Sequence, residues 1–130
     1  MVNGLLAVAA GGVVGAVARH LVYLTTGHLL GHGFPYASLI VNVVGSFAMG
    51  LLVEAMALVW SVSTEMRLFL TTGVLGAFTT FSTFSLDFAV LYERRALALC
   101  ALYTIASFAL SVGALFAGLH LMRRLLAPAL

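Results

Sequence analysis

Residues 71–85 decide the organisation of this chain, and they read Thr71-Thr72-Gly73-Val74-Leu75-Gly76-Ala77-Phe78-Thr79-Thr80-Phe81-Ser82-Thr83-Phe84-Ser85. Two glycines and seven hydroxyl side chains thus lie within a long apolar segment. Glycine and threonine are weak helix formers. Backbone can leave the helix at membrane depth only where protein or a water-filled cavity satisfies its polar groups. We therefore expect a membrane-spanning helix that breaks around residues 76–80, with carbonyls turned inward. A straight helix whose hydroxyls bond back to the preceding turn is the alternative.

The composition of the whole chain agrees with a membrane protein. Of its 130 residues, 63% are hydrophobic and 8% are charged, whereas soluble domains have about 25% charged residues. A bilayer span needs about 20 mostly apolar residues. The sequence predicts an all-α integral membrane protein, with residues 1–130 forming a single transmembrane domain. Its four spans are expected at about 5–24, 38–60, 68–91 and 96–122.

Charge and cysteine content exclude several other classes. The six basic residues are all arginines, scattered singly or in pairs, so no nucleic-acid patch is predicted. Cys100 is the only cysteine, which excludes an internal disulfide and a cysteine-based zinc site. The apolar segment 5–18 has no basic residue before it, so we expect a retained first span rather than a cleavable signal peptide.

The distribution of arginines bears on how the chain inserts. With four spans, one side of the membrane carries Arg67, Arg123 and Arg124, and the other carries Arg19, Arg94 and Arg95. Since basic loop residues set orientation, this balance predicts a dual-topology protein. Two oppositely inserted copies would then pair about a twofold axis in the membrane plane. Another feature that fixes the orientation is the alternative.

Two polar stripes flank the third span. Ser38, Asn42 and Ser46 share one helix face, and Tyr103, Ser107 and Ser111 repeat the same spacing. Single serines of this kind often serve only to hold helices together. Together with the hydroxyl-rich segment, the stripes instead favour an anion path rich in hydrogen-bond donors. Phe81 and Phe84 would turn positive ring edges toward the anion, although such a pair also occurs in lipid-facing or core packing.

Three motifs resemble the fluoride channels of the Fluc (CrcB) family. They are Gly11-Gly12-x-x-Gly15-Ala16-x-x-Arg19, Val41-Asn42-x-x-Gly45, and Gly73-x-x-Gly76-x-x-Thr79-Thr80-Phe81-Ser82-Thr83-Phe84-Ser85. The resemblance covers nearly the whole chain. It implies a channel rather than an enzyme, located in the bacterial plasma or inner membrane in contact with lipid. It further implies an antiparallel homodimer whose two pores export fluoride passively, lowering its toxic level in the cytoplasm. A structural sodium ion, which is not transported, would lie on the twofold axis.

The resemblance also assigns roles to individual residues. The sodium would be held by the backbone carbonyls of Gly76 and Thr79. Arg19 and Asp87 would belong to the vestibules. The fluoride pathway would include Ser38, Asn42, Phe81, Ser82, Thr83, Phe84, Tyr103, Ser107 and Ser111. Ala77, Ser38 and Asp87 depart from the family's frequent glycine, threonine and glutamate.

Two other functions are consistent with four spans. A small multidrug exporter needs a membrane-embedded carboxylate, but the first span has no acidic residue and Glu54 lies late in the second. An assembly subunit that only packs against other membrane proteins would leave a broken, hydroxyl-rich span unexplained. Within the channel hypothesis, the balanced arginines favour a homodimer over a pair of unlike subunits.

Overall fold

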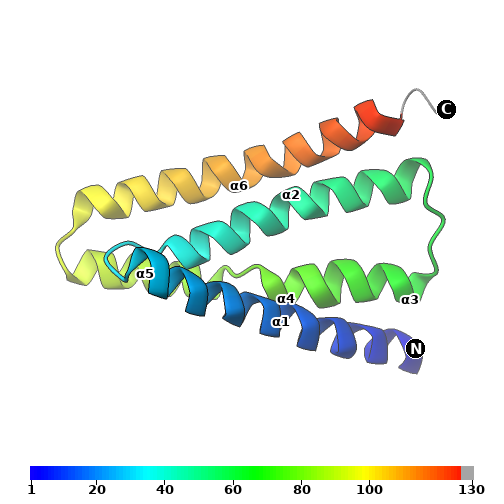
Figure 1. Ribbon diagram of the computed structural model, residues 1–130, viewed down its shortest axis with the longest axis horizontal. Helices are drawn as coiled ribbons and strands as arrows, with labels where there is room; N and C mark the ends of the chain where they lie inside the picture. Colours follow the sequence, from blue (N-terminus) through cyan, green and yellow to red (C-terminus); the bar gives the residue numbers. More distant parts are fainter. Residues whose placement is uncertain (127–130) are drawn as a thin grey trace.

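The computed structural model describes residues 1–126 as an all-helical protein. Three rods are single helices: α1 (Val2–Leu30), α2 (Tyr36–Leu58) and α6 (Leu97–Leu126). The third rod in chain order is built from four shorter elements, α3 (Thr64–Arg67), η1 (Leu68–Leu75), α4 (Gly76–Phe78) and α5 (Ser82–Glu93). Figure 1 shows the rods side by side, with the chain reversing direction at each connection. All four rods are long and apolar enough to cross a membrane, as the sequence predicts.

The first helix is longer than the predicted span 5–24. It continues through Gly27 to Leu30 and ends at Gly31, whose φ of 72° lies in the left-handed region that glycine adopts readily. At a rise of about 1.5 Å per residue, Arg19 therefore lies about 16 Å before the end of α1. The expectation that Arg19 lies near a loop is wrong. When Arg19 is left out, three arginines lie near one end of the bundle (Arg67, Arg123, Arg124) and two lie near the other (Arg94, Arg95).

Glycines let the helices approach closely in two pairs, α1 with η1 and α2 with α6. A Cβ atom added at Gly15 would lie 2.1 Å from the carbonyl oxygen of Val74, and one at Gly118 would lie 2.4 Å from the carbonyl oxygen of Phe47. Both distances are far below van der Waals contact. The two pairs are therefore packed backbone against backbone, as small residues permit in membranes.

The third rod departs from α-helix twice. Residues Leu68–Leu75 form a π-helix, which the sequence analysis did not foresee. After the three residues of α4, Thr79 is extended, with φ −80° and ψ 162°, and helical structure resumes at Ser82. The expected break is confirmed, although Gly76 and Ala77 remain helical and the non-helical residues are 79–81. Figure 1 shows the gap between α4 and α5 near the middle of the rod.

Candidate functional site

The break is held open by a side chain from a neighbouring helix. Asn42 on α2 accepts a hydrogen bond from the Thr80 N–H at 2.8 Å and donates one to the Thr80 carbonyl at 2.9 Å. In a continuous helix the Thr80 N–H would serve the carbonyl of Gly76, four residues earlier. The amide of Asn42 thus takes the place of both hydrogen-bond partners that the Thr80 backbone would have in a continuous helix. It also leaves the Gly76 carbonyl without the N–H donor that it would otherwise have.

Two further groups satisfy the backbone beside Asn42. The Thr83 N–H, which would serve Thr79 in a continuous helix, donates to Thr80 Oγ1 at 3.1 Å. The guanidinium of Arg19 donates to the Thr79 carbonyl at 3.3 Å. Each side chain supplies a hydrogen bond that the helix has lost, and an unpaired backbone group in an apolar setting costs several kcal/mol. The break is therefore a fixed part of the packed structure.

A cavity of about 400 Å³ opens beside the break, between α2 and α6. Its wall includes five residues that the sequence analysis assigned to the fluoride pathway: Asn42, Phe81, Phe84, Ser107 and Ser111. Ser46, from the polar stripe on α2, also lines it, and so do Thr80 and Thr104. No ionisable side chain is among the residues that line this cavity.

Ser107 and Ser111 differ from the other hydroxyls of their helix. Thr104 donates to the carbonyl of Cys100, one turn earlier, at 2.8 Å, as hydroxyls in apolar helices commonly do. The hydroxyl oxygens of Ser107 and Ser111 are buried and have no hydrogen-bond partner among residues 1–126. Buried polar groups are rarely left unpaired. These two hydroxyls therefore remain available to a guest in the cavity.

Aromatic rings form the rest of the wall near the break. The rings of Phe81 and Phe84 are 5.5 Å apart and inclined at 38°, and Phe84 lies 5.1 Å from Tyr103. Phe81 is 79% exposed, and it belongs to the non-helical segment rather than to a helix face. Irregular backbone at membrane depth needs protein or a water-filled cavity around it. Thr80 in this segment is buried, whereas the Phe81 ring lies open on this face.

A second polar cluster joins all four rods at one carboxylate, Asp87 on α5. Ser38 donates to Asp87, and Tyr103 donates to the same oxygen at 3.0 Å. Because the single proton of Ser38 is used in this way, Tyr23 on α1 is the donor in its 2.6 Å contact with Ser38. Ser38 and Tyr103 are almost wholly buried, with 1% and 0% exposed. The charge of Asp87 is thus stabilised by hydroxyl donors from α2 and α6.

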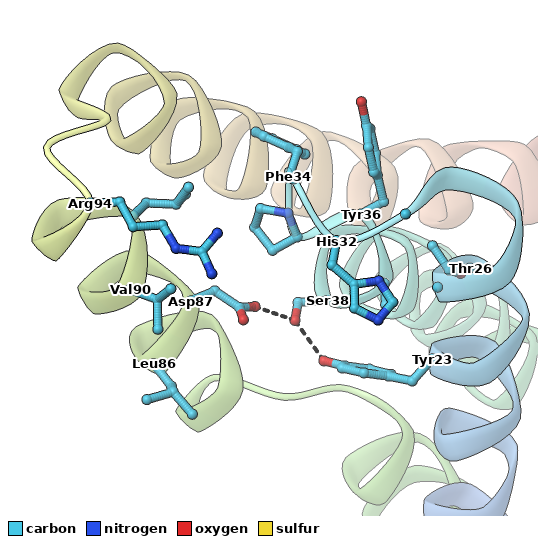
Figure 2. A pocket seen from close by; sticks show the side chains of 16 residues that line it. Tyr23, Thr26, His32, Phe34, Tyr36, Ser38, Leu86, Asp87, Val90 and Arg94 are labelled. Carbon is cyan, nitrogen blue, oxygen red and sulfur yellow. Dashed lines mark hydrogen bonds between the residues drawn. The ribbon is translucent and has the colours of Figure 1, made fainter.

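This cluster forms one wall of a cavity of about 280 Å³ at the end of the bundle where α1 meets α2 and α5 meets α6. Figure 2 shows Tyr23, Ser38 and Asp87 linked across its floor, with His32 and Arg94 beside them. The family resemblance predicts Ser38 in the ion pathway and Asp87 in a vestibule. The structure brings the two residues together at this cavity.

The predicted site residues therefore fall into three places. Six line the larger cavity, Thr79 among them, and Ser38, Asp87 and Tyr103 form the hydroxyl–carboxylate cluster. Arg19, predicted as a vestibule residue, donates to the Thr79 carbonyl and does not line the smaller cavity. Ser82 and Thr83 do not line either cavity. Their hydroxyls meet Thr80 Oγ1 at 3.5 and 3.0 Å.

Three contributing residues were not singled out from the sequence. Thr80 was quoted only as part of a motif, although its backbone and hydroxyl organise the break. Tyr23 follows Arg19 by four residues, so the spacing alone placed both on one face of α1. Arg94 was counted only as a loop charge. Its position at a cavity depends on the course of the α5–α6 connection, which no local pattern reveals.

The break also offers ligands suited to a hard cation. The Gly76 carbonyl has lost its usual donor, and the Thr79 carbonyl faces a cationic group. Backbone carbonyl oxygens are ligands that hard cations such as sodium prefer, so the residues present fit such an ion. In the part of the chain that the structure describes, no group of three His, Cys, Asp or Glu side chains forms a metal site.

The fold and site define a multi-pass helical membrane protein with a broken span beside a neutral, hydroxyl-lined cavity. The pattern of the family described as CrcB-like protein, Camphor Resistance (CrcB), matches residues 6–119. The chain belongs to this family, which confirms the resemblance found in the motifs. A protein of Rhodospirillum centenum named "Fluoride-specific ion channel FluC" is 59% identical over 119 residues, which cover 92% of this chain and 94% of the relative.

Two further relatives carry the same name. The protein of Chelativorans sp. is 56% identical over 122 residues, covering 94% of this chain and 98% of the relative. The protein of Agrobacterium fabrum is 56% identical over 118 residues, covering 91% and 94%. Family membership and four apolar rods together place the chain in the bacterial cell membrane as a multi-pass protein.

Proposed function

We propose that this chain is a subunit of a fluoride-selective channel that carries the ion passively out of the cell and so lowers its cytoplasmic level. The observation that carries the proposal is the larger cavity. Two buried serine hydroxyls with no partner among residues 1–126 line it beside Asn42 and two phenylalanine rings, and none of its lining residues is ionisable. A small, strongly hydrated anion needs donors in place of water, and this wall supplies donors without a fixed charge that would hold the ion too tightly.

The same cavity argues against the proton-coupled exporter. Such an exporter needs a carboxylate at its substrate site, and none lines this cavity. Glu54 is instead engaged with Arg123, whose Nε lies 2.7 Å from Glu54 Oε1 at the far end of α2. This pair ties α2 to α6 and leaves no acid facing the break. The names of the relatives support the channel function.

The working unit that we propose is an antiparallel, dual-topology homodimer with two fluoride pathways. Phe81 and the irregular backbone around it need a cover, and a second copy of the chain provides one. One chain also offers only the two carbonyls of Gly76 and Thr79 to a cation, whereas two copies offer four. The arginines near the two ends of the bundle are nearly balanced, three against two, and this allows the chain to insert into the membrane in both orientations.

A structural sodium ion would be held by these carbonyls, from two copies of the chain. When bound, it supplies fixed positive charge, which lowers the cost of an anion in a low-dielectric setting. Asn42 keeps the Gly76 carbonyl available by engaging the Thr80 N–H, whereas the Thr79 carbonyl accepts from Arg19 and would offer the ion its second lone pair. Arg19 already places one positive charge on this segment, close to the pathway.

The test is reconstitution into liposomes with a fluoride electrode and a potassium diffusion potential. We expect electrogenic fluoride efflux, no chloride efflux, and loss of activity when sodium is replaced by N-methyl-D-glucamine before reconstitution. Single cysteines added at each end of the bundle, probed with an impermeant reagent on intact cells, should each be labelled in part of the population. No fluoride efflux from verified dimers would contradict the channel function. Uniform labelling from one side would contradict dual topology alone.

A further inference from the structure

The turn between α5 and α6 places one arginine, Arg94, at the smaller cavity. It lines this cavity together with Tyr23, Ser38 and Asp87. Figure 2 shows its side chain reaching over the cavity on the side of the Asp87 carboxylate. The next residue, Arg95, has a left-handed φ of 60° and does not line the cavity. Two consecutive arginines of the same loop are thus placed differently with respect to one site.

The charge of Arg94 is not neutralised by a direct partner. Between residues 1 and 126 the ion pair found is Arg123 with Glu54, at the opposite end of the bundle. Asp87 is held by the hydroxyls of Ser38 and Tyr103 rather than by a cation. The cavity therefore contains one carboxylate stabilised by hydroxyls and one guanidinium free to attract an anion.

This arrangement poses an electrostatic problem for any anion that approaches Ser38. Asp87 repels it, and the interaction is stronger near a partly buried wall than in bulk water. A guanidinium at the same cavity offsets that repulsion, since it carries a permanent positive charge and five donors. Arg19 does not fill this role because its guanidinium is bound to the Thr79 carbonyl at the break.

We propose that Arg94 recruits a small inorganic anion into this cavity by offsetting the charge of Asp87. The inference rests on the proposed function, and on that function the anion is fluoride. Charged clefts raise the local concentration of oppositely charged ligands and their rates of entry by about tenfold or more. Arg94 therefore acts as a recruiting residue at the mouth, and its effect is on the concentration at which flux saturates rather than on the maximal flux.

The test compares Arg94→Gln with Arg95→Gln, because both remove one positive charge from the same turn. Fluoride efflux from liposomes is measured as a function of fluoride concentration, at low ionic strength and with an impermeant salt at about 1 M, where the Debye length falls to about 3 Å. At low ionic strength, Arg94→Gln should raise the half-saturating fluoride concentration by about tenfold with an unchanged maximum. Arg95→Gln and Arg94→Lys should stay near the wild-type value, and high salt should shrink the difference.

A second variant tests the offset itself. Adding Asp87→Asn to Arg94→Gln removes the repelling charge while keeping an oxygen that accepts from Tyr103, and it should return the half-saturating concentration toward the wild-type value. Three results would each overturn the role of Arg94. They are equal shifts of the half-saturating concentration in Arg94→Gln and Arg95→Gln, a lower maximal flux with an unchanged half-saturating concentration, and no rescue by Asp87→Asn. Folding is checked by gel-filtration elution in detergent. Wild-type protein without fluoride flux would overturn the channel function itself, which separates the two failures.

Discussion

Replacing Asn42 by alanine tests the central feature of the site, the side chain that keeps the third rod open. The change removes two hydrogen bonds, one to the N–H and one to the carbonyl of Thr80. Each buried backbone group left unpaired costs about 1–3 kcal/mol. If the break persists, Asn42→Ala should therefore destabilise the protein by about 2–6 kcal/mol. If the helix closes instead, the Thr80 N–H returns to the Gly76 carbonyl, and that carbonyl is no longer free.

Both outcomes predict loss of fluoride flux, and a sodium titration separates them from a general defect. Thermal unfolding of detergent-solubilised dimers is followed in sodium and in N-methyl-D-glucamine. Wild-type protein and the control Asn3→Ala, which changes an asparagine at the exposed start of α1, should gain stability from sodium. Asn42→Ala should gain little. Normal flux together with a normal sodium response in Asn42→Ala would refute the role given to this amide.

Three further changes test other contacts. Gly15→Ala inserts a methyl group 2.1 Å from a backbone carbonyl of η1, so it should lower the free energy of unfolding by about 1–3 kcal/mol. The control Gly12→Ala places its methyl group where no atom lies within 4 Å, and thermal unfolding should show no loss of stability. Ser107→Ala removes a buried hydroxyl that has no hydrogen-bond partner within the described residues 1–126, so fluoride flux should fall while stability stays level; equal losses of both would contradict a role in binding. Glu54→Gln weakens the bond to Arg123 between α2 and α6, and since that arginine is largely exposed, the melting temperature measured by thermal unfolding should fall only slightly.

The fold was largely predictable because a membrane-spanning helix requires a long run of apolar residues, which can be read directly from the sequence. Four apolar stretches separated by short polar turns predict four rods, and the structure has them. The ends were less accurate, because α1 runs through Gly27 and ends only at Gly31, where the backbone turns to a positive φ. The π-helix before Gly76 was not predictable, because its hydrogen bonds depend on how η1 packs against α1.

The candidate site shows the same division between local pattern and tertiary contact. Spacing placed Asn42 in the polar stripe of the second span and Ser107 and Ser111 in that of the fourth, and in the structure these three residues line one cavity. Periodicity gave no information on which backbone group each side chain would contact. The contact of Arg19 with Thr79 depends on how α1 packs against the third rod, and the position of Arg94 depends on the path of a turn.

The break is therefore a product of packing rather than of weak helix formers alone. Gly76 and Ala77 are helical, so an alanine where the family often has glycine does not obstruct the opening, which begins at Thr79. What opens the helix is a set of replacement hydrogen bonds from Asn42 on α2, Arg19 on α1 and Thr80 itself. Because these partners come from three different rods, the carbonyls stay accessible only while the bundle is intact. Any change that separates α1 or α2 from the third rod should abolish ion binding before it unfolds the helices.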